Sequence, residues 1–308
     1  MSIPLIAIGR SRYLYDSIRH LLSKGYRFKA IVTEEAYEEY DIKHTDFQKL
    51  AEESDAAFFM IKSLDNEQLI DIIKVNKIRL AISANWKYIV AKKFLDLFPD
   101  GILNFHLGNL PDYKGNATVN WTIINGETYI NGNIHKMEPE LDAGDVVARK
   151  AIPITPDTYV ADVLKQAEVD APLLYEEGIR RVLNEPGSYE VKGTQRGLRC
   201  YPRLPEDSQI DWSQSAENVG RLVRASSRPY TGAFSFLNGE KIIIWKARPV
   251  FPDEKFLAIP GHVIAFNRGN GTVTVACAEG FVELQEIERD GQVMAPATFI
   301  KSIRLRFK

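Results

Sequence analysis

Short apolar runs alternate with amphipathic segments along the first half of the chain. The runs are brief and almost wholly apolar, which indicates buried strands, and they cover residues 3–8, 28–32, 56–61, 80–84 and 102–105. Between them, apolar side chains recur at helical spacing in residues 16–23, 46–53 and 66–74. Strands that alternate with such helices form parallel βαβ units, so we expect an α/β domain with a mostly parallel sheet. Sites in such sheets lie beyond the carboxyl ends of the strands.

The pattern changes beyond residue 129. We expect further strands at 132–137 and 146–154, followed by a helical stretch at 160–184. Pro172 falls near the middle of that stretch and predicts a helix boundary or a kink there, because proline removes a hydrogen bond and clashes with the preceding turn.

The last third of the chain has the pattern of a small β domain. Residues 185–207 are rich in glycine and proline, which marks a connection between domains. Short strands then follow, separated by the hairpin dipeptides Asn238-Gly239, Asn270-Gly271 and Asp290-Gly291. These features predict a small, OB-like β-barrel. The expected organisation is an N-terminal catalytic domain at 1–185, a linker at 186–206 and the β domain at 207–308.

Composition excludes several classes of protein. The 308 residues are 45% hydrophobic and 26% charged, which is ordinary for a globular chain of two domains. A formal net charge of −2 gives no global basic field for nucleic acid. Two cysteines, Cys200 and Cys277, are too few for a disulfide framework. With neither a signal-peptide pattern nor a long apolar run, we expect a cytoplasmic protein that does not enter a membrane.

Candidate chemistry gathers near the end of the fifth expected strand. Asn104 and His106 lie two residues apart, so both side chains point to one face of that strand. Asp142 lies in a tight turn between two later strands, and the fold could return it to His106. Acyl transfer to an amine needs a proton relay and a donor to the tetrahedral oxyanion, roles that a histidine and an asparagine can fill. A nearby carboxylate orients such a histidine and favours its charged form.

The longer string around these residues resembles the folate-dependent formyltransferases. Matching positions occur in the family's order and spacing, namely Asn104, His106, Leu110, Pro111, Tyr113, Lys114, Gly115 and Asp142. The resemblance implies a Rossmann-like N-terminal formyltransferase domain, catalysis by Asn104, His106 and Asp142, and N10-formyltetrahydrofolate as cosubstrate. It also implies a folate pocket lined by two segments, with Ser83, Ala84, Asn85, Trp86 and Tyr88 on one side and Glu138, Pro139, Glu140 and Leu141 on the other.

The resemblance extends to the linker and the β domain, but it has departures. Leu107-Gly108-Asn109 follows the histidine where many relatives have Gly-Ser or Pro-Ser, so the loop's contact with substrate can differ. Lys114 replaces the commoner arginine, which exchanges a fork of donors for a point charge. The candidate substrate-binding residues are Gly108, Asn109, Tyr113, Lys114, Arg203 and Arg224.

The amine that accepts the formyl group stays open on the sequence. Residues 117–127 and the Arg203-x-Pro205-Glu206-Asp207 string look like enzymes that formylate a UDP-linked aminoarabinose, which favours a nucleotide-linked (UDP or dTDP) amino sugar. Relatives that act on methionyl-tRNA carry a basic loop where residues 33–41 here hold four glutamates and an aspartate, so we expect no nucleic-acid partner. A formyltetrahydrofolate hydrolase and a binding module without activity are further alternatives, and the resemblance is compatible with a homodimer.

Two kinds of bound group are not expected. The five histidines show no spacing typical of metal ligands, so we expect no metal. His135 falls on an expected strand, and we interpret it as a structural residue. The turn at Gly9 lacks the full G-x-G-x-x-G pattern, which argues against dinucleotide binding.

Overall fold

The computed structural model describes residues 3–35, 41–253 and 256–308. The chain divides into two compact units, each with its own sheet. Unit 1 comprises residues 1–118, 129–153 and 164–200, and unit 2 comprises residues 119–128, 154–163 and 201–308.

A seven-stranded sheet forms the centre of unit 1, in the order β3-β2-β1-β4-β5-β7-β8. The strands from β3 to β5 pair in parallel, and β7 and β8 continue the sheet antiparallel. The mostly parallel α/β sheet predicted from the sequence is therefore confirmed. The strands are β1 Pro4–Gly9, β2 Arg27–Thr33, β3 Ala57–Met60, β4 Leu80–Ala84, β5 Gly101–Leu107, β7 Tyr129–Lys136 and β8 Val146–Pro153.

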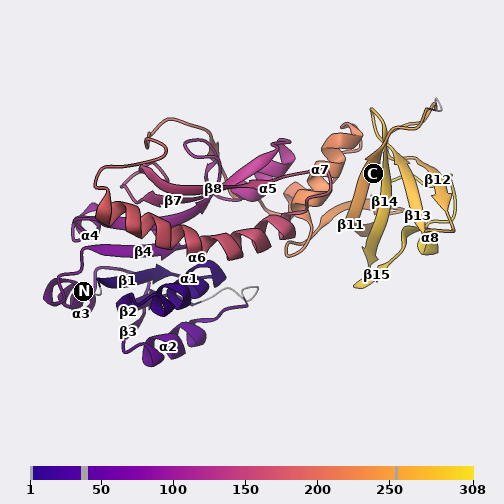
Figure 1. Cartoon of the computed structure of the whole chain (residues 1–308). Helices are drawn as coiled ribbons and strands as arrows, with labels where there is room; N and C mark the ends of the chain where they lie inside the picture. The colour runs from indigo at the N-terminus through magenta and orange to yellow at the C-terminus, as the bar shows by residue number, and fades with distance from the viewer. Residues whose placement is uncertain (1–2, 36–40, 254–255) are drawn as a thin grey trace. The chain divides into compact units, whose positions relative to one another are not determined.

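Helices cover both faces of this sheet (Figure 1). On one face, α3 buries Leu69 and Ile73 against Ile6 and Ile8 of β1. On the other face α6 lies beside α1, and Tyr175 of α6 packs on Phe105 of β5. The helices of the first two hundred residues are α1 Arg12–Ser23, α2 His44–Glu53, α3 Glu67–Val75, α4 Lys92–Leu95, α5 Thr118–Ile124 and α6 Val160–Asn184.

The helix α6 runs through Pro172 without ending there. Of the boundary and the kink that the sequence predicts at Pro172, the boundary is therefore wrong. Tyr175 and Ile179 beyond it are fully buried, and Gly178 packs on Ile134 and Val147. Burial of each large apolar side chain contributes about 1.5–3 kcal/mol, which is enough to offset the cost of roughly 3 kcal/mol for an interior proline.

The strand order reverses between β1 and β4. β1 pairs with β2 on one side and with β4 on the other, and open α/β sheets bind ligands beyond the carboxyl ends at such a point. β5 lies next to β4, with Asn104 opposite Ser83 in the register. The candidate residues of β5 therefore lie next to the carboxyl end of β4.

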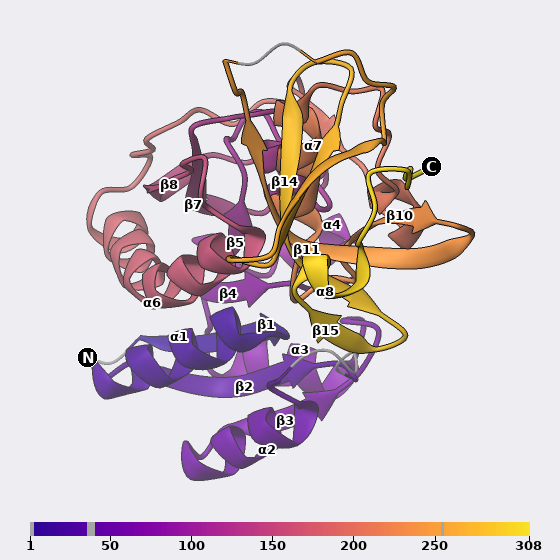
Figure 2. The same ribbon diagram turned by 90° about the vertical axis from the view of Figure 1, so that its right-hand side faces the viewer.

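Unit 2 is built on an antiparallel sheet in the order β10-β11-β14-β13-β12, with β15 paired to β14. Figure 2 shows β11 and β14 running beside each other in this sheet. The strands are β10 Ala233–Leu237, β11 Glu240–Val250, β12 Val263–Asn267, β13 Thr272–Ala276, β14 Phe281–Arg289 and β15 Gln292–Met294. Unit 2 also contains the 3-10 helix η1 Pro205–Ser208 and the helices α7 Ala216–Ser226 and α8 Pro296–Phe299, whereas the short strands β6 Lys114–Gly115 and β9 Arg199–Cys200 belong to unit 1.

The sheet of unit 2 is not a closed barrel. Among the described residues β10 and β12 do not pair directly, and single bridges from Phe307 to Leu237 and from Arg306 to His262 lie at the two edges instead. The small β domain is confirmed, but its described strands form an open sheet and not the closed barrel expected from the sequence, and its likeness to an OB domain stays a prediction. Two of the expected hairpin turns have positive φ at both central residues, at Asn238-Gly239 and Asp290-Gly291, as type I′ turns require.

No described helix combines the length and the apolar character that crossing a bilayer requires.

The close approach of β1 to β4 favours glycine at position 9. Its φ is +132°, and an added Cβ would lie 2.0 Å from the carbonyl oxygen of Ala84. Gly25 has a φ of +88°, but a Cβ added there would meet only open space. We expect Gly9→Ala to lower the free energy of unfolding by about 1–3 kcal/mol more than Gly25→Ala, because only the first substitution overpacks. Urea denaturation of both variants measures this difference, and equal losses would contradict it.

Candidate active site

β5 presents Asn104 and His106 as the alternation of a strand predicts. Phe105 between them points to the opposite face, where its ring lies 5.2 Å from that of Tyr13 and 6.4 Å from that of Tyr175. The strand is thus anchored by apolar packing on one face while its polar residues share the other. His106 is 9% exposed, so its ring is largely withdrawn from water.

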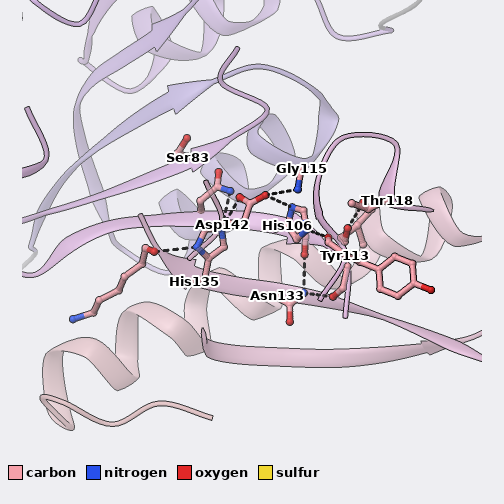
Figure 3. Close-up of polar contacts among 12 residues, drawn as sticks. Ser83, His106, Tyr113, Gly115, Thr118, Asn133, His135 and Asp142 are labelled. Carbon is pink, nitrogen blue, oxygen red and sulfur yellow. Dashed lines mark hydrogen bonds and ion pairs between the residues drawn. The ribbon is translucent and has the colours of Figure 1, made fainter. Parts of the chain in front are cut away.

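The turn between β7 and β8 brings Asp142 to His106. Figure 3 shows the carboxylate of Asp142 between the rings of His106 and His135. Its Oδ2 lies 3.5 Å from His106 Nδ1, and its Oδ1 lies 3.5 Å from His135 Nε2. The backbone N–H of Gly115 donates to Oδ2 at 2.9 Å. Residues far apart in the sequence therefore meet around one carboxylate.

His135 joins the predicted trio. β7 places it opposite Asn104 in the register, and its Nε2 lies 3.1 Å from Asn104 Nδ2. Its Nδ1 lies 3.0 Å from the carbonyl oxygen of Lys136, which can only accept, so Nδ1 carries a hydrogen. Its place on an expected strand predicts a structural role for His135. The antiparallel register of β7 on β5 is the signal that reveals it.

Both ring nitrogens of His106 face oxygen acceptors. Nε2 lies 2.8 Å from the carbonyl oxygen of Tyr113, and Nδ1 faces Asp142 (Figure 3). Because a backbone carbonyl cannot donate, Nε2 must be the donor in that contact. The ring is therefore held in one orientation from both ends.

The surroundings keep the carboxylate of Asp142 ionised. Burial alone would raise its pKa, but the charge of His106, the hydrogen bond and charge of His135 and the N–H of Gly115 outweigh burial. The net result is a pKa well below the usual range of an aspartate. The site thus holds a fixed negative charge next to two imidazoles.

The loop after β5 is held by amide side chains. The amide nitrogen of Asn133 lies 2.7 Å from the carbonyl oxygen of Gly108 and 3.0 Å from that of His106. Asn109 accepts from the backbone and side-chain amides of Asn131 through its Oδ1. A Cβ at Gly108 would lie 2.6 Å from His106 Nε2, so this position requires glycine. Gly108 and Asn109 build the loop whether or not they also contact substrate.

The cationic candidates for substrate binding already have partners. The ammonium group of Lys114 donates to the carbonyl oxygens of Thr194 and Arg196, and the side chain is buried. In unit 2, Arg203 donates to the carbonyl oxygen of Asp207 at 2.7 Å, and Arg224 donates to that of Thr158 at 2.9 Å. Their role in binding substrate stays a prediction.

The expected folate segments lie on both sides of β5. Ser83 and Ala84 end β4 and are buried, whereas Asn85 after them is exposed with a φ of +53°. Trp86 and Tyr88 pack edge to face and line a cavity of about 270 Å³, whose wall also includes Phe94. The opposite segment, Glu138, Pro139, Glu140 and Leu141, is exposed before Asp142.

Metal ligands do not gather in the part of the chain that the structure describes. No group of three or more histidine, cysteine, aspartate or glutamate side chains there is arranged to hold an ion. The histidines of the site bond to Asn104, Asp142 and backbone carbonyls instead.

Two family models match the chain. The model described as Formyl transferase covers residues 16–175, and the model described as Formyl transferase, C-terminal domain, covers residues 204–304. The first spans more than half of the chain and contains all the residues of the site. The chain therefore belongs to the formyl transferase family.

Solved structures share the fold at low identity. HypX from Aquifex aeolicus in complex with tetrahydrofolic acid is 17% identical with a TM-score of 0.61, over 97% of this chain and 47% of HypX, so the chain spans about half of that protein. An N-formyltransferase from Helicobacter canadensis, solved with folinic acid and dTDP-3-aminofucose, is 16% identical with a TM-score of 0.64, over 92% and 98% of the two chains. A 4-N formyltransferase from Francisella tularensis is 18% identical with a TM-score of 0.61, over 79% and 96%.

The ionised state of Asp142 predicts how stability depends on pH. A group whose pKa is lowered by folding contributes stability above its unfolded pKa of about 3.9, and the contribution disappears as pH falls through the folded value. We expect Asp142→Asn to lower the free energy of unfolding by about 1–3 kcal/mol near neutral pH. The difference from wild type should shrink below about pH 4.

Urea unfolding of both proteins at several pH values measures this effect, with Asp71→Asn on the exposed face of α3 as the control. A difference between wild type and Asp142→Asn that stays constant down to about pH 3 would contradict the assignment of Asp142 as a buried anion.

Proposed function

We propose that the chain transfers a formyl group from N10-formyltetrahydrofolate to the amine of a nucleotide-linked amino sugar, carried by UDP or dTDP. The observation that carries the proposal is the carboxylate of Asp142, which is 10% exposed and lies 3.5 Å from His106 on the polar face of β5. Membership of the formyl transferase family supports the class of reaction. Asn104, His106 and Asp142 are the proposed catalytic residues.

The three side chains have the chemistry that this transfer requires. The neutral amine attacks the formyl carbon, a carbon–nitrogen bond forms, and the carbonyl oxygen becomes an oxyanion. Asn104, whose Nδ2 lies 3.1 Å from His135 Nε2, is placed on the polar face of β5 to donate an amide hydrogen to the oxyanion. The amine then loses a proton, the bond from carbon to N10 breaks, and N10 receives a proton. His106, oriented and charged by Asp142, gives a proton to N10 and takes the proton of the amine in return, and one of its contacts, to Tyr113 or to Asp142, opens during this relay.

The cavity lined by residues from 62–74 and 86–97 supports a folate as the formyl donor. Trp86, Tyr88 and Phe94 give it an aromatic wall that suits a flat ring. Lys62, Lys74 and Lys93 also line it and suit the carboxylates of a glutamate tail, although Lys93 is already paired with Asp65 at 2.6 Å. Three of the similar structures were solved with a reduced folate. We assign the segments at 83–88 and 138–141 to this cosubstrate.

A sugar nucleotide is the acceptor that the relatives favour. Similar structures include sugar N-formyltransferases, and an N-formyltransferase among them was solved with dTDP-3-aminofucose. Gly108, Asn109, Tyr113, Arg203 and Arg224 are the residues that we propose for its binding, whereas the ammonium group of Lys114 is engaged by the carbonyl oxygens of Thr194 and Arg196. We assign catalysis to the domain at 1–185, which residues 186–206 join to the OB-like β domain at 207–308.

The acidic stretch at 33–41 argues against a tRNA acceptor only in part. Glu34 is buried and pairs with Arg10 at 3.2 Å, and Asp41 pairs with Arg12. Residues 36–40 lie outside the described part of the chain. The stretch therefore has no basic side chain that could bind phosphates, but not all of its carboxylates face solvent, because Glu34 is buried.

A product assay with several acceptors tests the proposal and its alternatives together. The purified protein would receive N10-formyltetrahydrofolate labelled with ¹³C in the formyl group, together with UDP- and dTDP-linked amino sugars, methionyl-tRNA, or no acceptor. We expect mass spectrometry to detect the labelled formyl group on an amino sugar. His106→Ala should lower the rate by a factor of about 10²–10⁴, because the proton relay is lost.

His44→Ala, at the start of α2, serves as the matched control and should retain the wild-type rate. Labelled tRNA would replace the proposal with a methionyl-tRNA formyltransferase. Labelled formate without any acceptor, and no labelled sugar, would replace it with a formyltetrahydrofolate hydrolase.

A further inference from the structure

The segment at 190–200 lies across both loops that shape the candidate site. It belongs to unit 1 and follows α6 after a short turn. Its glycines and its position suggest a flexible connection, yet its backbone is bonded to other parts of unit 1 along most of its length. We call residues 190–200 the strap.

The first half of the strap is fixed to the turn that carries Asp142. The N–H of Val146 donates to the carbonyl oxygen of Val191 at 3.0 Å, and the N–H of Gly193 donates to Asp145 Oδ1 at 2.8 Å. A Cβ at Gly193 would lie 2.2 Å from the carbonyl oxygen of Ala143. The strap therefore approaches this turn too closely for any side chain at Gly193.

The second half of the strap is fixed to the loop at 111–116. Lys114 donates through its ammonium group to Thr194 and Arg196, and through its N–H to the carbonyl oxygen of Leu198 at 3.0 Å. Asp112 Oδ1 accepts from the N–H of Leu198 at 2.7 Å. At Gly197, where φ is +128°, a Cβ would lie 2.1 Å from the carbonyl oxygen of Pro111.

The two loops held by the strap supply the contacts that orient the catalytic pair. Tyr113 and Gly115 flank Lys114, and they accept from His106 and donate to Asp142 respectively. The turn at 142–145 carries Asp142 itself. Displacement of the strap would therefore move an acceptor of the imidazole, a donor to the carboxylate and the carboxylate together.

We propose that Lys114 is a positioning residue. Its hydrogen bonds hold the strap against the loop at 111–116 and so fix the positions of His106 and Asp142 for the reaction. Its ammonium group is engaged by two backbone carbonyls and acts through the loop, not on the phosphates of the substrate. Burial lowers the pKa of Lys114, which is consistent with an interior position. The assignment rests on the proposed function because one of its tests measures the rate of formyl transfer.

Lys114→Met keeps the length of the side chain and removes its donors. We expect the kcat for formyl transfer to fall about 10- to 100-fold, with the KM for both substrates changed less than about threefold, because misplaced groups lower turnover more than affinity. The ring ¹⁵N NMR signals of His106 should shift. Lys114→Arg keeps several donors within reach of both carbonyls and should restore most of the activity and the wild-type signals.

Gly197→Ala tests the strap without changing any charged group. It should reproduce the loss of kcat and the shift of the His106 signals, because the added methyl group would clash with the carbonyl oxygen of Pro111 and push the strap away from it. Lys49→Met, on the exposed face of α2, is the control and should match wild type in every readout.

Two results would overturn the assignment. In the first, Lys114→Met raises the KM for the sugar nucleotide and leaves kcat and the His106 signals unchanged, which identifies Lys114 as a substrate contact. In the second, Gly197→Ala leaves the His106 signals unchanged in a folded protein. If the wild type formylates no amino sugar, the proposed function fails, and the NMR comparison alone decides whether the strap positions His106.

Discussion

The carboxylate of Asp142 is the interaction on which the rest of the site depends. A buried anion is costly unless opposite charge and hydrogen bonds surround it. Here His106, His135 and the N–H of Gly115 supply both, and together they lower the pKa of Asp142. Each partner comes from a different strand or loop, so the site forms only when β5, β7 and the loop at 111–116 are all in place. The same arrangement fixes the orientation of the His106 ring, which the proposed proton relay requires.

Much of the fold and part of the site follow from local sequence patterns. The apolar runs predict the parallel strands because burial on both faces requires near-continuous apolar side chains. Alternation along one strand is enough to place Asn104 and His106 on a common face, with Phe105 buried opposite them. The position of Asp142 beside His106 followed only from the family resemblance, since spacing alone does not bring a turn back to a strand.

The features that the sequence did not reveal all depend on tertiary contacts. His135 joins the site through the register of β7 on β5, which no short motif encodes. The helix α6 continues through Pro172 because the side chains beyond this residue are buried. Gly193 and Gly197 resemble linker residues, but they are glycines because two backbones meet there. Composition cannot distinguish a glycine that gives flexibility from one that permits close packing.

The orientation of His106 and the ionised state of Asp142 therefore depend on the same contacts. The most direct test is a ¹³C NMR titration of the Asp142 side chain, assigned by comparison with Asp142→Asn. The account predicts that this carboxylate stays ionised while pH falls well below about 3.9, as long as the protein remains folded. Protonation of Asp142 at or above that value would show that His106 and His135 do not hold it as an anion, and would contradict the account.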